Sequence, residues 1–417
     1  MKRMLALSLT CALALASLSG CTTPSTAQPL SAQPIPLSQE QLVQYDPEAT
    51  EVYAALSSFG MELLKNVRQE GTDTLISPLS VSLALAMAAN GADHNTLSQF
   101  EQVLGGDASL EAINVACHAL LSIYQNLLGG STQCSIANSV WADPDGQISE
   151  EFIGRCAGIF DAQIFQEDLS ASGIVPALNG WVSEHTNNMI PQIISQPFQE
   201  STAALLVNAL YLKNTWAQKF DPNSTHERTF TFENGQTEDI DFLNTGFCTF
   251  PYIQGEGVQG AVLPYDDGRL GFFALLPDQD LDSWLSTLEG ADFTALLSQR
   301  TDTQFLHLGL PKFEAEWRGD LSSTLAQLGL EDAFLPGVAD FSQMGDLGEG
   351  SYLSQVIHAT KIKVNEKGTE AAAATVVAAS GSSAPAEEGI TLIFDRPFLY
   401  GIVDLQNGVP LFIGTFE

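Results

Sequence analysis

One stretch near the end of the chain combines a pattern suited to a β-strand with a pattern suited to proteolysis. From Thr369 to Val377 every second residue is small and uncharged, so these side chains form one face that could fit between packed neighbours. The stretch runs into Ser380-Gly381-Ser382-Ser383-Ala384-Pro385, a flexible tip of the sort that proteases cut. A segment that is a loop and can become a strand is a switch. The reaction that this segment is suited to is cleavage of its backbone by a protease.

The rest of the sequence offers no catalytic centre. Serine, aspartate and six histidines are present, but there is no Gly-x-Ser-x-Gly elbow, no metal motif and no phosphate-binding loop. Cys11 and Cys21 lie in the N-terminal leader, and the other four cysteines form no Cys-x-x-Cys pair. These four are Cys117, Cys134, Cys156 and Cys248. We therefore predict no enzyme, no metal site and no cofactor. One or two disulfides are compatible with export, in a pairing that the sequence leaves open.

The chain is strongly acidic. Its 50 Asp and Glu against 16 Lys and Arg give a net charge of −34 over 417 residues. Such a molecule is repelled by phosphate backbones and anionic lipid headgroups, which makes nucleic acid and heparin-like polyanions poor partners. A hydrophobic content of 45% with five tryptophans is typical of a globular protein. We interpret the acidity as solubility in an extracellular or salty medium.

Residues 1–20 are predicted to be a lipoprotein signal peptide. Lys2 and Arg3 precede an apolar stretch, Met4 to Leu18, that is too short for a stable membrane span. The sequence ending in Gly20-Cys21 resembles a bacterial lipobox, in which Cys21 is lipidated after cleavage; the alternative is an ordinary signal peptide. Residues 21–45, rich in Thr, Ser, Gln and Pro, are expected to be a flexible tether. The mature protein would then be an exported cell-envelope lipoprotein, bound to the membrane only through Cys21.

Residues 46–417 are predicted to be one α+β domain. A helical pattern begins behind Asp46 as a possible cap and continues to Val67. A second, almost wholly apolar helix follows Ser77-Pro78. Residues 203–212 suit a central strand covered on both faces. Gln406-Asn407-Gly408 is a hairpin signal between apolar runs at 391–403 and 409–416.

Six motifs in this domain together resemble the serpin family. They are Ser77-Pro78-Leu79-Ser80; Asn179-x-Trp181-Val182 with Thr186; Asn208-Ala209-Leu210-Tyr211-Leu212-Lys213-x-x-Trp216 followed by Phe220 and Thr225; Leu310-Pro311-Lys312-Phe313; Glu366–Thr375; and Leu392-Ile393-Phe394-Asp395-Arg396-Pro397-Phe398-Leu399-Tyr400. One motif alone would be modest evidence, but six occur in family order. The resemblance covers residues 46–417 and leaves out the leader and the tether.

The resemblance implies a fold and a mechanism. The fold has three β-sheets, about nine helices and an exposed reactive-centre loop, here about residues 366–390. A target protease cuts the loop and is held as an acyl-enzyme while the loop inserts into the main sheet as a new strand. The protease is dragged along and its active site is distorted. Such a protein is a suicide substrate that inhibits serine endopeptidases.

The resemblance also implies a hinge at the start of the loop. Its residues are Glu366, Lys367, Gly368, Thr369, Glu370, Ala371, Ala372, Ala373, Ala374 and Thr375. On insertion the alternate side chains from Thr369 to Val377 would face the core, and none of them brings charge or bulk. Gly368 would supply backbone freedom where the strand turns in. Non-inhibitory serpins often carry a bulky residue, a charge or a proline here, so the sequence favours an inhibitor.

Two further sites follow from family position. Ser77, Ser80, Asn208 and His358 would form the shutter, a polar cluster under the main sheet where its strands part. Trp216 would lie with Glu366 at the breach, the top of the sheet where insertion begins. Each shutter residue could equally be a hydrogen-bonded polar residue of an ordinary core.

Family spacing counted from Glu366 places the reactive bond between Ser382 (P1) and Ser383 (P1′). The loop is a few residues longer than in many relatives, so four alternatives stay open: Val377, Ala379, Ser380 and Ala384. Neither Lys nor Arg occurs between Lys367 and Arg396, so trypsin-like proteases should be poor targets. Elastase-like and subtilisin-like proteases fit better, and papain-like cysteine proteases are a further candidate. We expect a monomer.

The alternative function is that of a non-inhibitory binding protein or a simple protease substrate, because a longer loop could delay insertion. Complexes that resist denaturant would separate an inhibitor from a substrate. A large rise in thermal midpoint after loop cleavage would separate both from a rigid binder.

Overall fold

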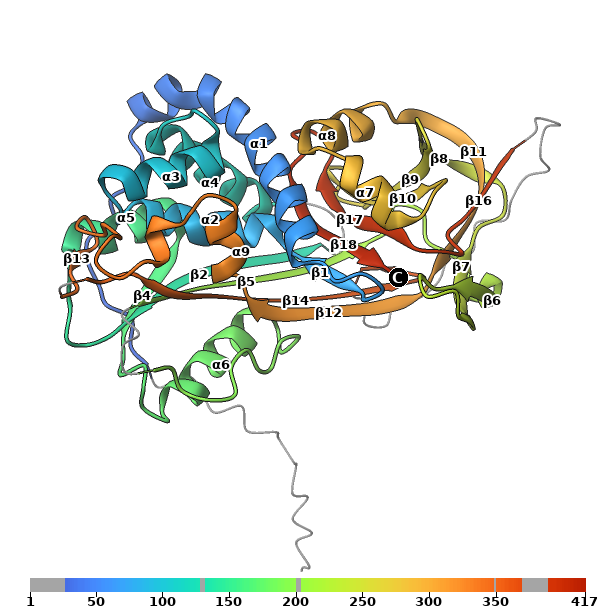
Figure 1. Ribbon diagram of the computed structural model, residues 1–417. Helices are drawn as coiled ribbons and strands as arrows, with labels where there is room; N and C mark the ends of the chain where they lie inside the picture. Colours follow the sequence, from blue (N-terminus) through green and yellow to red (C-terminus); the bar gives the residue numbers. More distant parts are fainter. Residues whose placement is uncertain (1–26, 128–131, 200–203, 349, 370–388) are drawn as a thin grey trace, which may run out of the picture.

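The computed structural model describes residues 27–127, 132–199, 204–348, 350–369 and 389–417. In these residues it contains nine α-helices: α1 (Gln39–Val67), α2 (Pro78–Ala89), α3 (His94–Gly105), α4 (Leu110–Gln125), α5 (Glu150–Phe160), α6 (Ile174–His185), α7 (Leu281–Thr287), α8 (Gly290–Ser298) and α9 (Ser322–Gln327). The helices α1 to α5 gather on one face of a long sheet, and α6 lies alone on the other face (Figure 1).

That long sheet has six strands. Their order is β12 (Phe313–Asp320), β14 (Leu353–Asn365), β15 (Gly368–Thr369), β5 (Ala204–Thr215), β2 (Gln133–Ala142) and β4 (Ala162–Gln166). The central strand β5 is buried at nearly every position, as its continuous apolar sequence predicts. It pairs with β2 in an antiparallel register over ten residues.

The second sheet has ten strands and forms the other half of the molecule. Its order is β1 (Thr74–Ile76), β18 (Pro410–Phe416), β17 (Phe398–Asp404), β10 (Leu270–Pro277), β9 (Val258–Pro264), β8 (Cys248–Gly255), β11 (Thr301–Pro311), β7 (Thr237–Asn244) and β6 (His226–Thr231). A tenth strand, β16 (Ile390–Ile393), pairs in parallel with β11. The third sheet is the short pair β3 (Gln147–Ile148) and β13 (Gly345–Asp346).

The apolar helix α2 lies at the centre of the fold. All twelve of its residues are buried. Pro78 occupies the first turn, where no backbone N–H is needed, and the hydroxyl of Ser77 caps the helix by accepting the Ser80 N–H. The helix contacts both β5 and β18, so it holds the two large sheets together. This placement brings the polar Ser77 and Ser80 beneath the long sheet.

The chain begins to pack well before residue 46, which makes the predicted tether wrong for residues 27–45. The Leu30 N–H donates to the Ile164 carbonyl of β4 at 2.6 Å, and the Ile35 N–H donates to Gly154 of α5 at 2.8 Å. Gly158 is required here, because a side chain on it would collide with the backbone of Ile35. The prolines of this segment suit an extended strand laid over an existing edge rather than a free linker.

Helix α1 also starts seven residues before the predicted cap at Asp46. Ser38 and Gln41 form a capping box, in which each side chain bonds to the other residue's backbone. The helix then continues through Pro47, although proline removes one intrahelical hydrogen bond. The sequence analysis missed this start because Asp46 offers a plausible cap directly before the apolar repeat.

The predicted strand at 391–403 is in fact two strands in different places. β16 ends at Ile393 and β17 begins at Phe398. Pro397 lies between them and has no N–H for a strand ladder. The hairpin signal at Gln406-Asn407-Gly408 is confirmed, because β17 and β18 pair in an antiparallel register on either side of it.

Candidate functional site

The long sheet contains a slot between its two central strands. β5 and β14 pair with each other only at the foot of the sheet, where Ala204–Leu206 lies beside Leu353–Val356. At the head of the sheet the two-residue strand β15 lies between them. Among the described residues, no strand fills the space between residues 207–213 of β5 and 357–363 of β14. The slot therefore begins at β15 and runs toward the foot of the sheet.

The first residues of the predicted hinge already occupy the head of this slot. Thr369 lies opposite Val364 on one side and Asn214 on the other, and it is only 1% exposed. Gly368 lies opposite Asn365 and Thr215, and a side chain on it would collide with the Asn214 carbonyl. Gly368 was predicted to supply backbone freedom, and in the structure its missing side chain lets β15 approach β5 closely.

The side chain of Thr369 faces inward, toward Tyr265. The two hydroxyls are hydrogen-bonded. Burial raises the pKa of Tyr265, so its phenol stays protonated and can take part as donor or acceptor. Tyr265 was not predicted from the sequence. It follows β9 in chain order, and no motif or spacing connects it with residue 369.

Trp216 organises the head of the sheet, where the resemblance places it. Its indole stacks on the Tyr265 ring with centroids 4.8 Å apart and planes 11° apart. The indole N–H donates to the Asn365 carbonyl at 2.8 Å, and the backbone N–H donates to the Lys367 carbonyl at 3.0 Å. Trp216 thereby holds the end of β14 and the start of the hinge at once.

The carboxylate of Glu366 anchors the hinge from the other side. It accepts hydrogen bonds from the Lys312 ammonium at 2.9 Å and from the Thr225 hydroxyl at 3.0 Å. Burial by itself would raise the pKa of Glu366, but its own backbone N–H, Lys312 and Thr225 together lower it. The side chain therefore stays ionised, and the hinge has a fixed point just before β15.

The structure describes only four of the ten predicted hinge residues. Glu370, Ala371, Ala372, Ala373, Ala374 and Thr375 lie outside the described residues, as do Ser382, Ser383 and the alternative cleavage positions. Cys21 and the signal peptide also lie outside them.

The four predicted shutter residues lie close together under the slot. The Ser77 N–H donates to His358 Nε2 at 3.0 Å, and the Ser77 hydroxyl donates to the Leu411 carbonyl at 2.6 Å. The Ser80 hydroxyl donates to the Asn208 amide oxygen. All four are buried, and they connect helix α2 with β5, β14 and β18.

A fifth residue, Asn138 of β2, completes this cluster. The Asn208 amide donates to the Asn138 side-chain oxygen, and the Asn138 amide donates to the Phe160 carbonyl at 3.0 Å. Asn138 and Asn208 lie directly opposite each other in the β2–β5 pairing. The available signal was an amide side chain within the sequence of β2, because a buried amide must find partners.

Replacing Asn208 by alanine should destabilise the native state. The change removes one acceptor and one donor and leaves the Ser80 hydroxyl and the Asn138 oxygen buried without these partners. The expected loss in the free energy of unfolding is about 2–3 kcal/mol. Urea unfolding of the uncleaved protein measures it. Replacing the surface residue Asn223 by alanine is the matched control, and an equal effect in both variants would contradict the role of the cluster.

The comparison with known proteins agrees with this geometry. The family model described as "Serpin (serine protease inhibitor)" matches residues 54–417. The chain is a member of the serpin family. A serpin-like protein of Thermococcus kodakarensis, itself uncharacterized, is 30% identical over 94% of this chain and 91% of its own length. The leukocyte elastase inhibitor of Xenopus tropicalis is 29% identical over 87% of this chain and 98% of its own.

Solved serpin structures confirm the fold. The thermophilic serpin Tengpin in its native state has a TM-score of 0.80 and 33% identity, over 93% of this chain and 96% of its own. In its latent state the same protein has a TM-score of 0.74, over 88% and 97%. Human thyroxine-binding globulin, complexed with its hormone, shares the fold at 21% identity (TM-score 0.79, 88% and 98%). The predicted serpin fold, with three sheets and about nine helices, is confirmed, and the chain resembles native Tengpin more than latent Tengpin.

This serpin should lose stability as the pH falls below about 6.5. Burial lowers the pKa of His358 from 6.5 to about 3 in the native state. Above pH 6.5 the imidazole is neutral in both states. Between pH 6.5 and 3 only the unfolded chain takes up the proton, so the free energy of unfolding falls by up to about 1.4 kcal/mol per pH unit.

Urea unfolding at pH 7 and pH 5 measures this dependence. The contribution of His358 should be about 2 kcal/mol, because the pH passes 1.5 units below the ordinary pKa. The variant His358→Gln keeps an acceptor for the Ser77 N–H but cannot titrate, so its stability should fall less over the same range. Equal losses in the two proteins would show that His358 is not the group responsible.

The four cysteines of the described domain are free thiols. Burial raises the pKa of Cys117 and of Cys134 to about 12, and it also raises the pKa values of Cys156 and Cys248. All four remain protonated at neutral pH, which suits neither nucleophilic nor metal-binding chemistry. In the part of the chain that the structure describes, no cluster of His, Cys, Asp and Glu could hold a metal ion. No helix within that part is long and apolar enough to cross a membrane.

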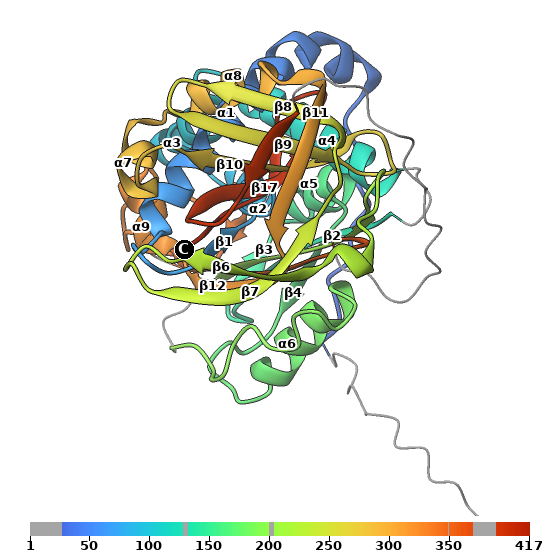
Figure 2. The ribbon, with the colours of Figure 1, turned by 90° about the vertical axis from the view of Figure 1, so that its right-hand side faces the viewer.

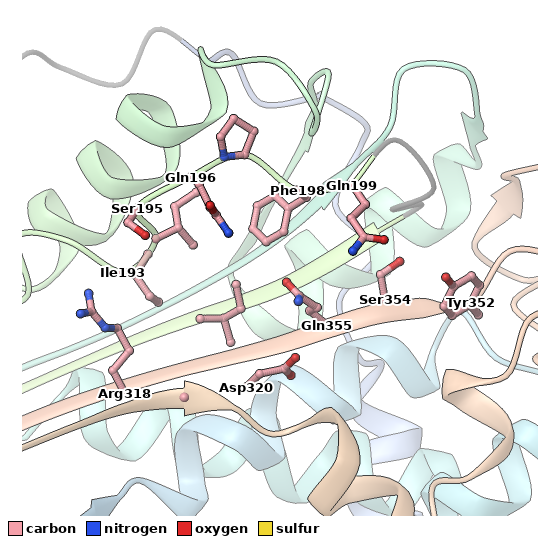
Figure 3. Close-up of a pocket in the computed structure, with 14 residues that line it drawn as sticks. Ile193, Ser195, Gln196, Phe198, Gln199, Arg318, Asp320, Tyr352, Ser354 and Gln355 are labelled. Atoms are coloured by element: carbon pink, nitrogen blue, oxygen red, sulfur yellow. The ribbon is translucent and has the colours of Figure 1, made fainter.

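A cavity of about 580 Å³ lies over the foot of the slot. Its roof is the stretch 193–199 that follows α6, and its floor comes from β12 and β14 (Figure 3). Polar side chains dominate the lining, among them Gln196, Gln199, Arg318, Asp320 and Gln355. The Arg318 guanidinium donates to the Gln192 carbonyl at 2.9 Å, which ties this roof to β12. A strand that filled the slot to its foot would have to pass beside this cavity.

Proposed function

We propose that this serpin is an inhibitor of serine endopeptidases that acts as a suicide substrate, by loop cleavage, acyl-enzyme trapping and loop insertion. The observation that carries the proposal is the position of β15. Two hinge residues already pair with both neighbouring strands, and between them and the foot of the sheet no described strand pairs with the facing edges of β5 and β14. Insertion would therefore extend a register that is already set, one residue pair after another, and would part β5 from β14 where the two strands pair at the foot of the sheet. The chain would act on proteases in this way and would not itself be an enzyme.

Continuing the β15 register assigns a partner to each residue of the loop. Each step moves one residue further along the loop and one residue back along β5 and β14. Thr375 would lie opposite Asn208 and His358, where its hydroxyl could join the shutter. Ala379 would lie opposite Ala204, the first residue of β5, and Ser380 opposite Leu353, the first residue of β14. For the loop to enter as far as residue 379 or 380, β5 and β14 would have to part at the foot of the sheet, where Ala204–Leu206 now pairs with Leu353–Val356.

This length supports Ser382 and Ser383 as the reactive bond. Cleavage after Ser382 would leave two or three residues below the filled slot, where the trapped protease would be attached. Cleavage after Val377 would leave the foot of the sheet unfilled, because the residues opposite Ala204 and Leu205 would be on the released fragment. Cleavage after Ala384 would leave more chain free than the sheet can hold.

The side chains that line the slot suit the small residues of the loop. Ala371 would lie opposite Leu212 and Ile362, both of which are buried. Larger residues at this position would collide with them. On the outer face, Glu370 would lie between Lys213 and Lys363, so the charged hinge residue would be placed beside two opposite charges.

The target proteases that we propose are elastase-like or subtilisin-like, with papain-like cysteine proteases as a further candidate. A small residue at P1 suits a small or permissive specificity pocket. One relative of this chain bears the name leukocyte elastase inhibitor, which supports the first class. We expect the serpin to act as a monomer.

We also propose that the protein is exported and anchored through a lipid on Cys21. The segment from residue 22 to residue 26 would be the whole tether, because the chain packs from residue 27 onward. Five extended residues span at most about 18 Å, so the domain would be held close to the membrane surface. Labelling with a radioactive fatty acid in a lipoprotein-forming bacterium tests this, with Cys21→Ala as the unlabelled control.

Inhibition is tested by mixing residues 22–417 with neutrophil elastase and with subtilisin. We expect a covalent complex on a denaturing gel and a released C-terminal peptide whose mass begins at Ser383. Clean cleavage without a complex would move the protein to the alternative function, a simple substrate or a non-inhibitory binder. A released peptide that begins at another residue would overturn the assignment of the reactive bond but not the mechanism.

A further inference from the structure

One aromatic side chain remains exposed at the end of the molecule where β16 begins. Phe247 is 48% exposed, and it is the only aromatic residue among the large exposed hydrophobic residues of the described chain. It lies in the connection between β7 and β8. Figure 2 looks directly onto this end of the molecule, where β11 crosses in front of β8 and β9.

Phe247 is held in place by its neighbours. Its ring stacks on Phe305 of β11 with centroids 5.2 Å apart and planes 19° apart. The ring of His307, two residues further along β11, lies with its centroid 5.7 Å away. Offset stacking fixes the orientation of the Phe247 ring without burying it. We name Phe247, Phe305 and His307 the aromatic patch.

The aromatic patch touches the point at which the reactive loop returns to the body. Gly389 is the first described residue after that loop, and a side chain on it would collide with the rings of Phe247 and Phe305. The following residues form β16, in which Ile390 and Thr391 lie opposite Leu306 and His307 of β11. The patch is therefore continuous with the C-terminal end of the loop that the proposed target would cut.

A protease bound to the loop would reach this patch. Only five residues lie between Ser383 and Gly389, so these two residues are at most about 22 Å apart even when the chain is fully extended. A globular protease of about 240 residues has a radius of gyration near 18 Å. Its surface beside the active-site cleft must therefore come against the end of the molecule that carries Phe247.

We propose that the aromatic patch is a second contact surface for the target protease, in addition to the loop. This inference rests on the proposed function. The partner that it fits is a protease whose rim carries an arginine among apolar residues, because a guanidinium stacks well on an exposed aromatic ring. The net charge of −34 favours the same kind of rim by attracting basic surfaces. The patch selects among proteases whose specificity pockets accept the same P1 residue.

The patch affects the first encounter between the protease and the loop, and it does not affect insertion of the cut loop. Its role can therefore be tested separately from the insertion mechanism. Phe247 lies in the connection between β7 and β8, and its ring packs on Phe305 and His307 of β11, a strand of the second sheet. Phe247→Ala should therefore slow loop cleavage about tenfold, a typical effect for an aromatic contact residue. The number of protease molecules trapped per serpin consumed should not change. Phe247→Tyr keeps the ring and should keep the rate, and Val338→Ala, at an exposed apolar position elsewhere (53% exposed), is the matched control.

The measurement is the second-order rate constant for loop cleavage by whichever of neutrophil elastase and subtilisin reacts faster, after thermal midpoints show that the variants are folded. A selective fall for Phe247→Ala supports the proposal. Equal rates in all four proteins overturn it while leaving inhibition intact. If the wild type is cleaved without forming a complex, the proposed function fails, and the same rate comparison still decides the role of the patch. A chain that neither protease cleaves overturns both.

Discussion

Replacing Thr369 by arginine should convert this serpin from an inhibitor into a substrate. Thr369 is 1% exposed between β5 and β14, and its hydroxyl is bonded to the buried Tyr265. An arginine here would have to bury its guanidinium without a carboxylate partner, at a cost on the order of 3–5 kcal/mol. In the uncleaved variant residue 369 should therefore leave the sheet, so that insertion has to bury the guanidinium; a barrier raised by that amount slows insertion roughly a thousandfold. Hydrolysis of the acyl-enzyme would then release the protease before the loop is inserted.

The stoichiometry of inhibition measures this effect. The wild type should consume about one serpin per protease trapped, whereas Thr369→Arg should be cleaved at an undiminished rate and should give no denaturant-resistant complex. Ala372→Arg carries the same charge at a position that the register places on the outer face, opposite Tyr211 and Lys361, where the long side chain can keep its guanidinium in solvent. It should trap protease nearly as well as the wild type. If Thr369→Arg still traps protease at full stoichiometry, the insertion mechanism is wrong.

Cleavage of the loop should raise the thermal midpoint by about 10 °C. Insertion would add residues 370–379 to the slot, where each could pair with β5 on one side and β14 on the other. Net gains of about 0.5–1.5 kcal/mol per hydrogen bond give a stabilisation on the order of 10 kcal/mol, which shifts the midpoint of a protein of this size by about 10 °C. The polar backbone groups facing the slot would also gain permanent partners.

Differential scanning calorimetry before and after cleavage by subtilisin measures this change. The cleaved Thr369→Arg variant is the control, because its loop is cut in the same place but should not enter the sheet. A wild type whose midpoint moves by less than about 3 °C on cleavage would have a sheet that does not expand. The fold would stand in that case, and the protein would be a rigid binder or a simple substrate.

Much of this arrangement could be predicted because it depends on local pattern. The apolar run from 203 to 212 predicts a strand covered on both faces, and β5 is such a strand. Ser77-Pro78 predicts the start of a buried helix, and α2 begins there. The hairpin at Gln406-Asn407-Gly408 depends on turn residues that favour one backbone geometry. In each case neighbours in sequence are also neighbours in space.

The errors of prediction arise where distant parts of the chain meet. Residues 27–38 look like a linker because their composition gives no pattern, but the edge of β4 and the glycines of α5 provide a surface for them. Helix α1 extends before Asp46 because Ser38 and Gln41 cap it, and a single proline does not outweigh that cap together with the packing of the helix. The break at Pro397 separates β16 from β17, since each strand finds a different partner.

The sequence by itself determined the resemblance to the family and, through it, an α+β fold with three sheets. It also determined the small residues of the loop and the polar residues beneath the slot. Only the tertiary structure decided how the hinge is held, because Tyr265 and Asn138 meet Thr369 and Asn208 across 104 and 70 residues of chain. Tertiary contact also decided that Gly368 and Thr369 already lie in the sheet and that Phe247 lies beside the end of the loop. The physical reason is that a strand register is set by hydrogen bonds between segments far apart in sequence, and no spacing along one segment encodes its partner.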